Sequence, residues 1–162
     1  MTGAIPKELG YLSNIEILGL GRNKLSGLIP SSFSNLSSLI ILNLGTNFLG
    51  GTISSDLGCL QNLEWLDLTT NVLTGTVPPS IYNISSLVHF GLASNQLWGQ
   101  IPSDIGDKLP NLLDFNFCIN KFTGTIPLSL HNVTHIHNIR MADNHLVGSV
   151  PLGLENLPEL WM

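Results

Sequence analysis

The sequence is poor in charged residues, which make up 10% of its 162 positions, and its six Lys plus Arg residues leave a net charge of −5. Proteins that bind nucleic acids neutralise phosphates with clusters of basic side chains. Six scattered cations cannot form such a basic stripe. The composition therefore argues against nucleic acid as a partner.

Long hydrophobic runs are missing too, although 43% of the residues are hydrophobic. No apolar stretch approaches the roughly 18 residues that a membrane-spanning helix requires, and we recognise no N-terminal signal peptide. We therefore expect no transmembrane segment here, so membrane contact would come only through a segment outside these residues.

Cysteines are scarce, with only Cys59 and Cys118 in the chain. They lie about two and a half repeats apart, at different phases of the repeat described below, which separates them by roughly 12 Å at about 4.8 Å per stacked strand. A disulfide bond cannot span that distance, so we expect two free thiols.

Catalytic signatures are also missing, since the sequence has no HExxH, GxSxG or P-loop motif. Asp67 and Asp114 are expected on one sheet face about 10 Å apart, just beyond the carboxylate spacing of an inverting glycosidase. Four histidines occur close together in the sequence but at different positions of the repeat: His131, His135, His137 and His145. We therefore expect no shared metal site, no cofactor and no enzymatic activity in these residues.

What the sequence has in abundance is periodicity. An asparagine returns every 24 residues, with a single step of 25, at Asn23, Asn47, Asn71, Asn95, Asn120 and Asn144. Apolar residues keep the same period around it in the block LxxLxLxxNxL, the signature of a leucine-rich repeat. We predict a single array over residues 1–162, with about six complete repeats of 24–25 residues, partial repeats at both ends and no capping repeats.

The leucine block also predicts local structure. Its xxLxL segment alternates as a half-buried strand, so stacked copies should form a parallel sheet with the leucines inside. The asparagine that follows cannot be buried without hydrogen-bond partners, because an unpaired buried amide costs about 1 to 3 kcal/mol. We therefore predict that the six asparagines form a ladder bonded to neighbouring backbone.

A Gly-x-Ile/Val-Pro element follows each block and resembles the plant-specific subclass of leucine-rich repeats, whose consensus is LxxLxxLxLxxNxLxGxIPxxLxx. It occurs at Gly3 to Pro6, Gly27 to Pro30, Gly75 to Pro78, Gly99 to Pro102, Gly124 to Pro127 and Gly148 to Pro151, and the copy that begins at Gly51 has Ser54 in place of the proline. The resemblance implies an α/β solenoid, a right-handed superhelix with a parallel concave sheet, a short second sheet and a 3-10 or irregular helical outer side.

The same resemblance implies a function: the ligand-recognition ectodomain of a plant leucine-rich-repeat receptor-like Ser/Thr kinase in defence or developmental signalling. An extra residue in Gly106-Asp107-Lys108 is similar to a feature of an immune-receptor-type subfamily. Such receptors are single-pass proteins that expose this domain on the extracellular, apoplastic side of the plasma membrane. Their partners are a peptide or protein ligand and a leucine-rich-repeat co-receptor kinase, while ATP and Mg²⁺ belong to a kinase domain absent from these residues.

Two alternatives share the same repeats. One is a secreted inhibitor of pathogen cell-wall-degrading enzymes, resembling the polygalacturonase-inhibiting proteins, and the other is a receptor-like protein without a kinase. The 162 residues leave the three functions open. The sequence beyond Met162 separates them, because a membrane span with kinase motifs marks a receptor kinase and a cysteine cap marks an inhibitor.

Three N-glycosylation sequons share one repeat column, 48 and then 49 residues apart, at Asn35, Asn83 and Asn132. Random matches to so short a motif are common. The shared register, on the side away from the strands, nevertheless favours glycans on the outer side of alternate coils. We therefore expect a secreted or cell-surface chain whose inner face is free of glycans.

Outward positions of the concave strands form the predicted binding face. One column runs through Ile17, Ile41, Trp65, His89, Asp114 and Asn138, the next through Gly19, Asn43, Asp67, Gly91, Asn116 and Arg140, and a third through Gly21, Gly45, Thr69, Ala93, Cys118 and Ala142. Trp65 is the expected apolar anchor, since exposed aromatic side chains often dominate interfaces. Polar specificity is expected from Asp67, His89, Asp114, Asn116, Asn138 and Arg140.

Overall fold

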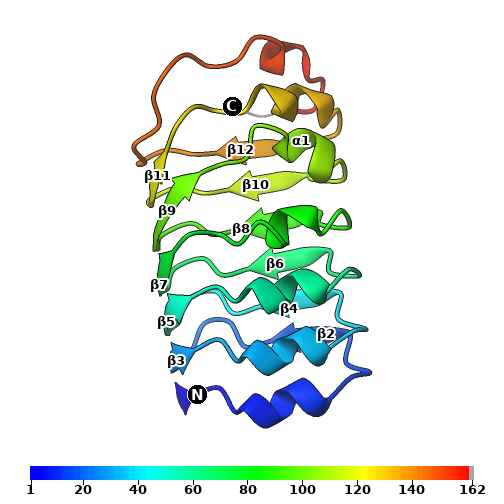
Figure 1. Cartoon of the computed structure of the whole chain (residues 1–162), viewed down its shortest axis with the longest axis vertical. Helices are drawn as coiled ribbons and strands as arrows, with labels where there is room; N and C mark the ends of the chain where they lie inside the picture. Colours follow the sequence, from blue (N-terminus) through cyan, green and yellow to red (C-terminus); the bar gives the residue numbers. More distant parts are fainter. Residues whose placement is uncertain (161–162) are drawn as a thin grey trace.

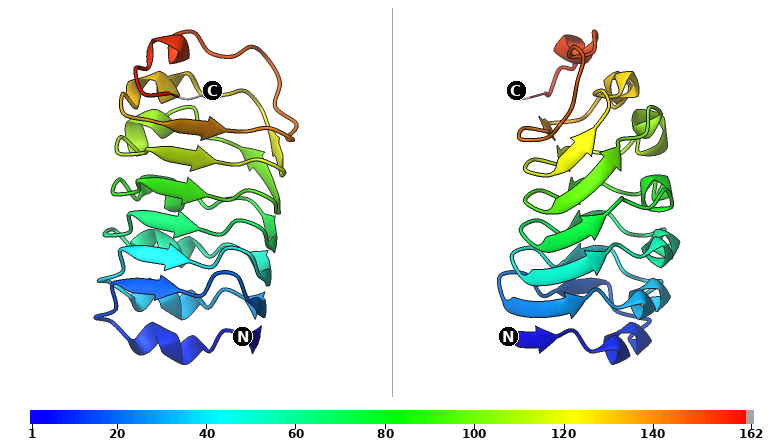
Figure 2. Two further views of the ribbon diagram at one scale, coloured as in Figure 1. Left: turned by 180° about the vertical axis from the view of Figure 1, so that it is seen from behind. Right: turned by 60° about the vertical axis from the view of Figure 1, so that its left-hand side comes forward.

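The computed structural model describes residues 1–160 as a stack of coils wound into a solenoid (Figure 1). From residue 17 to residue 132, each coil contains a strand, a turn, a second short strand and a helical segment. In these residues the strands form two parallel sheets of six strands each, which cover two adjoining sides of the stack (Figure 2). The predicted solenoid with a parallel sheet and a second short sheet is confirmed.

The concave sheet, with its strands in spatial order, consists of β2 (Ile17–Gly19), β4 (Ile41–Asn43), β6 (Trp65–Asp67), β8 (His89–Gly91), β10 (Asp114–Asn116) and β12 (Asn138–Arg140). The second sheet consists of β1 (Thr2–Ala4), β3 (Lys24–Leu28), β5 (Phe48–Thr52), β7 (Val72–Gly75), β9 (Gln96–Gln100) and β11 (Lys121–Thr123). Neighbouring strands in each sheet belong to successive coils, so residues one repeat apart become spatial neighbours.

The outer side carries short helices. The 3-10 helices are η1 (Lys7–Tyr11), η2 (Ser31–Asn35), η3 (Ser55–Cys59), η4 (Ile81–Asn83), η5 (Leu128–Asn132) and η6 (Leu154–Asn156). The coil with the extra residue forms the α-helical turn α1 (Ile105–Lys108) instead. Its amide of Leu109 bonds to the carbonyl of Ile105 at 2.9 Å, so the inserted residue is absorbed by widening a 3-10 turn into an α turn. Within residues 1–160, no helix has the length and apolarity needed to cross a bilayer.

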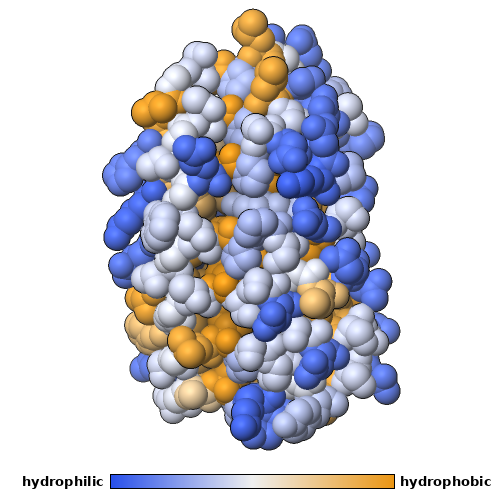
Figure 3. Space-filling model, in the orientation of Figure 1, coloured by the Kyte–Doolittle hydropathy of each residue, from blue (hydrophilic) through white to orange (hydrophobic). Residues whose placement is uncertain are grey.

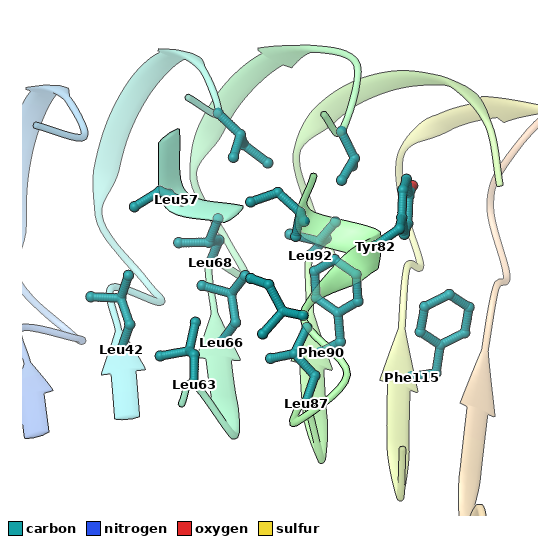
Figure 4. Packing of buried hydrophobic residues seen from close by; sticks show 14 of the residues in the cluster. Leu42, Leu57, Leu63, Leu66, Leu68, Tyr82, Leu87, Phe90, Leu92 and Phe115 are labelled. Carbon is teal, nitrogen blue, oxygen red and sulfur yellow. The ribbon is translucent and has the colours of Figure 1, made fainter. Parts of the chain in front are cut away.

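The core is a continuous column of apolar side chains, to which every coil adds its leucines (Figure 4). Leu42, Leu66 and Phe90 occupy equivalent positions in successive coils and are fully buried. Burying a side chain of this size stabilises the fold by about 1.5 to 3 kcal/mol. Phenylalanine replaces leucine without breaking the pattern, and the rings of Phe115 and Phe117 pack with centroids 4.2 Å apart.

Each ladder asparagine joins two coils. In the central example, Asn71 Nδ2 donates to the carbonyl oxygens of Leu68 in its own coil at 3.1 Å and Leu44 in the preceding coil at 3.2 Å. Its Oδ1 accepts the amide of Leu49 at 2.9 Å. Equivalent bonds from Asn47 and Asn120 repeat this pattern. The asparagine side chains thus add to the backbone hydrogen bonds between coils, which continue through this turn, as from the amide of Asn71 to the carbonyl of Ser94 at 3.1 Å.

The Gly-x-Ile/Val-Pro element ends the second sheet and leads into the helical side. Its first glycine has a positive φ in every copy, for example +81° at Gly27, which an L side chain rarely adopts. The copy without proline keeps the same path, because Ser54 accepts the amide of Asp56 at 3.2 Å and starts η3 as a side-chain cap.

Candidate functional site on the concave sheet

The candidate site is the outward face of the concave sheet, whose strands lie in front in the left view of Figure 2. Parallel pairing places Trp65 beside His89, His89 beside Asp114 and Asp114 beside Asn138. The second column pairs Asp67 with Gly91, Gly91 with Asn116 and Asn116 with Arg140. All seven sequence-predicted binding residues therefore lie on one face, over the four strands from β6 to β12.

Three of these residues form a connected unit. The rings of Trp65 and His89 are stacked, with centroids 3.8 Å apart and an interplanar angle of 10°. His89 Nδ1 lies 2.9 Å from Asp114 Oδ2, and the imidazole is well buried while Trp65 is 39% exposed. Asp114 thus fixes the imidazole, and the imidazole supports one face of the indole.

The glycine at position 91 makes room for this arrangement. A Cβ atom there would lie 2.9 Å from His89 Nε2 and 3.1 Å from a methyl carbon of Thr69. A larger residue at position 91 would therefore require the imidazole to shift from the position in which it stacks on Trp65.

The electrostatics of the unit favour an ionised Asp114. Its hydrogen bond with His89 lowers the pKa of the carboxyl group, and the charges of His89, Arg140 and His137 act in the same direction against the opposing effect of burial. The second oxygen, Oδ1, is buried without a hydrogen-bond partner within residues 1–160. Asp114 thus positions His89 through Oδ2, and its contact with a ligand stays a prediction.

Asp67 lies one strand before His89 and in the neighbouring column. Its Oδ1 accepts hydrogen bonds from the amide and the hydroxyl of Thr69 at 2.9 and 2.7 Å. The carboxylate leans over Gly45, where a Cβ atom would lie 2.7 Å from Oδ2. It borders a polar hollow of about 420 Å³, lined by Gly19, Gly21, Arg22, Asn43, Gly45, Thr46, Asp67 and Thr69.

The other end of the face is polar and basic. Arg140 is exposed and its Nη2 approaches Asn138 Oδ1 at 3.4 Å, while Asn116 Oδ1 accepts the amide of Cys118 at 3.4 Å. The face as a whole therefore offers an aromatic surface, a carboxylate and a basic amide-rich end. Within residues 1–160, no group of three His, Cys, Asp or Glu residues is placed to hold a metal ion.

The repeat period predicts the columns of outward residues but not the contacts between the side chains within them. The sequence carries one signal for the stacked unit, which is that a tryptophan, a histidine and an aspartate follow one another in one column, one repeat apart. A second missed contact lies beside the site, where Glu159 reaches His137 at 3.0 Å and His135 at 3.9 Å. The two cysteines are free, as expected.

The sequon asparagines lie on the outer side, away from the candidate site. Asn35, Asn83 and Asn132 are each the last residue of a 3-10 helix and are exposed. Asn132 differs from the other two because its Nδ2 donates to Asp107 Oδ1 at 2.6 Å. The three side chains thus project from alternate coils.

A second hollow, of about 820 Å³, lies between the second sheet and the 3-10 helices near the N-terminal end. Its walls include Leu28, Pro30, Ile53 and Pro78. Figure 3 shows hydrophobic residues gathered over these coils, whereas the surface toward the right of the view is mostly white to blue. The residues that line this hollow include no aromatic side chain and a single charged one, Lys7, whereas several aromatic and charged side chains converge on the concave face.

Comparison with known proteins finds the same fold in leucine-rich-repeat proteins. Residues 13–73 match a family model described as Leucine rich repeat. No curated protein sequence matches the chain. Among solved structures, the plant peptide hormone receptor RGFR1 in complex with RGF2 is 35% identical, with a TM-score of 0.94 over 98% of this chain and 25% of that one.

Two further receptors are similarly close in structure. A TDR receptor is 31% identical, with a TM-score of 0.93 over 98% of this chain and 27% of its own. The Arabidopsis receptor kinase HAESA, in complex with the peptide hormone IDA and the co-receptor SERK1, is 31% identical with a TM-score of 0.92 over 98% of this chain and 26% of its own. The chain thus spans about a quarter of the length of these receptors.

Proposed function

Because the chain belongs to the leucine-rich-repeat family, we propose that it is part of the ligand-recognition ectodomain of a plant cell-surface receptor. The observation that carries this proposal is the Trp65–His89–Asp114 unit, which holds an exposed aromatic ring on a rigid sheet. A ring that is already fixed loses little conformational entropy when a ligand covers it.

The proposed ligand is an extended peptide or protein segment that lies across the strands of the concave sheet. The four strands from β6 to β12 span about 14 Å at roughly 4.8 Å per strand. An extended segment of about four residues covers that distance at roughly 3.3 Å per residue. Trp65 would supply the apolar contact, and Asp67, His89, Asn116, Asn138 and Arg140 the polar contacts.

The wider context follows from the similar structures. RGFR1 is described with the peptide RGF2, and HAESA with a peptide hormone and a co-receptor. We extend this arrangement to the full-length receptor that contains the present chain. Its second partner would be a leucine-rich-repeat co-receptor kinase. A Ser/Thr kinase on its cytoplasmic side would transmit the signal in defence or development. ATP and Mg²⁺ would bind that kinase and not these residues. Sequencing the transcript beyond Met162 tests this part, and a cysteine cap followed by a stop codon would instead favour the secreted inhibitor.

We also propose an extracellular, apoplastic location with N-glycans at Asn35, Asn83 and Asn132. All three are exposed on the outer side, so glycans there would leave the concave sheet accessible. Expression in plant cells followed by glycan-removal mass mapping should find all three asparagines modified. Three unmodified asparagines would contradict the secretory location.

Photo-crosslinking tests which face binds the ligand. Peptides that the 162-residue chain retains from a random pool are resynthesised with one photoreactive residue and crosslinked. We expect attachment on the outward positions of β6 to β12, near Trp65 and Asn116. Attachment confined to the second sheet or the helices would contradict the proposed site.

A further inference from the structure

Asp67 differs from the other carboxylate on the concave face. Asp114 bonds to His89, whereas within residues 1–160 no ion pair involves Asp67. Thr69 occupies one of its oxygens through two hydrogen bonds. The other oxygen, Oδ2, accepts no hydrogen bond from residues 1–160, although it borders a polar hollow. The fold therefore fixes this carboxylate while leaving half of its bonding capacity unused.

The surroundings give that oxygen access to a ligand. Asp67 and Trp65 are two residues apart on β6, so their side chains lie on the same face of the sheet. The hollow beside Asp67 is lined by Gly19, Gly21 and Gly45 together with polar residues that include Asn43 and Arg22. A ligand group can thus approach the carboxylate over the glycines.

We propose that this corner binds a cationic side chain of the ligand, an arginine guanidinium or a lysine ammonium, next to Trp65. This inference rests on the proposed peptide-binding function and specifies the chemistry of the ligand at this site. A carboxylate oxygen forms strong charge-assisted hydrogen bonds with such cations, and an indole ring attracts them to its face.

Two other charges restrict where the cation can lie. Arg22 lines the same hollow from a coil two repeats earlier and forms no ion pair with Asp67 within residues 1–160. Arg140, at the β12 end, repels a second cation there. Both arginines repel a cation of the ligand. The positive group is therefore expected between Asp67 and Trp65, away from Arg22 and from the β12 end, and this orients the segment across the sheet.

The test compares pools of random 12-residue peptides in which one central position is fixed as arginine, lysine, citrulline or glutamate. Citrulline keeps the shape of arginine and removes its charge. The wild-type chain is compared with Asp67→Asn, which preserves the acceptor for Thr69, and with Glu64→Gln. Glu64 is exposed, adjoins Trp65 in the sequence and does not line the hollow, so its substitution is a control for the change in net charge.

We expect the wild-type chain and Glu64→Gln to retain the arginine and lysine pools at least about tenfold better than the citrulline pool, and Asp67→Asn to lose this preference. A preference that persists in Asp67→Asn, or equal retention of all pools by the wild-type chain, would overturn the cation site while leaving peptide binding intact. Failure of the wild-type chain to retain any pool would contradict the binding function itself, and the cation site with it. Circular dichroism confirms that each variant is folded.

Discussion

At the scale of single residues, the turn between the two sheets imposes an unusual backbone conformation. The residue before each ladder asparagine has a positive φ between 53° and 58°, and these residues are Arg22, Thr46, Thr70, Ser94, Ile119 and Asp143. None is glycine, although the left-handed region disfavours side chains, and β-branched ones most of all. Ile119 is therefore the least suitable occupant, and it is also 53% exposed.

Replacing Ile119 with asparagine should stabilise the chain. Asparagine tolerates the left-handed region, whereas isoleucine there costs about 1 kcal/mol or more, and little burial is lost at an exposed site. We expect the free energy of unfolding in urea to rise by about 1 kcal/mol. Leu128→Asn, at a site of similar exposure without positive φ, should change it by less than about 0.5 kcal/mol. Equal effects of the two substitutions would contradict the strain at Ile119.

Asp114 gives a pH dependence with a defined sign. Its pKa is lower in the folded chain than normal, so its ionised form adds stability above the unfolded pKa of about 3.9, and this contribution disappears as the pH falls through the folded value. Asp114→Asn should therefore destabilise the chain at pH 7, and its difference from wild type should shrink as the pH falls below about 4. Urea unfolding at several pH values measures this, and a difference independent of pH would refute it.

At the scale of the elements, the asparagine ladder holds successive coils in register. Each member bonds backbone groups of its own coil and the preceding one, and Asn47, Asn71 and Asn120 are buried. The short strands of three residues in the concave sheet could not exclude a shift of register by themselves. The ladder therefore contributes directly to the alignment of Trp65, His89 and Asp114 in one column.

Removing one central ladder side chain should be costly. Asn71→Ala leaves the buried amide of Leu49 without its partner and removes one of the two donors to the carbonyl of Leu44, which keeps its bond from Asn47. We therefore expect a loss of about 1 to 3 kcal/mol in unfolding free energy. Asn62→Ala is the matched control, because the exposed Asn62 donates a single bond to the carbonyl of Ser37. Comparable losses for both variants would show that the ladder has no special role.

Close packing on the outer side depends on glycines that the sequence pattern did not single out. A Cβ at Gly106 would lie 1.9 Å from the carbonyl oxygen of Ser129, and a Cβ at Gly10 would lie 2.4 Å from that of Ser32. These glycines let the helical turn of the next coil approach closely. The same approach brings Ser129 Oγ within 3.0 Å of the Gly106 amide, whose proton it accepts.

At the scale of the whole molecule, the sequence predicts the position of each residue in the repeat better than it predicts the contacts between side chains. The period of 24 residues assigns Trp65, His89 and Asp114 to one column, because side chains alternate along a strand and coils stack in register. It does not predict the stack of Trp65 on His89 or the bond to Asp114, because these depend on side-chain torsions that no repeat encodes. The contact between His137 and Glu159 of the following coil is not predicted by the repeat either, for the same reason.

Within residues 1–160 the solenoid presents two exposed tryptophans on different faces, which allows a controlled test of the binding surface. Trp65 lies on the concave sheet at 39% exposure, and Trp98 lies on the second sheet at 54%. Both can be truncated without emptying the core. Of these two, Trp65 is the one whose ring is stacked on another aromatic ring in the part of the chain that the structure describes, and this contact preorganises it for a ligand.

The most direct measurement is the affinity of the wild-type chain, Trp65→Ala and Trp98→Ala for one peptide selected on the wild-type chain. If the concave face is the binding surface, Trp65→Ala should weaken binding by at least about 2 kcal/mol, roughly 30-fold in Kd, while Trp98→Ala leaves it unchanged. Unchanged affinity in Trp65→Ala, or a loss confined to Trp98→Ala, would contradict the assignment of ligand recognition to the concave face.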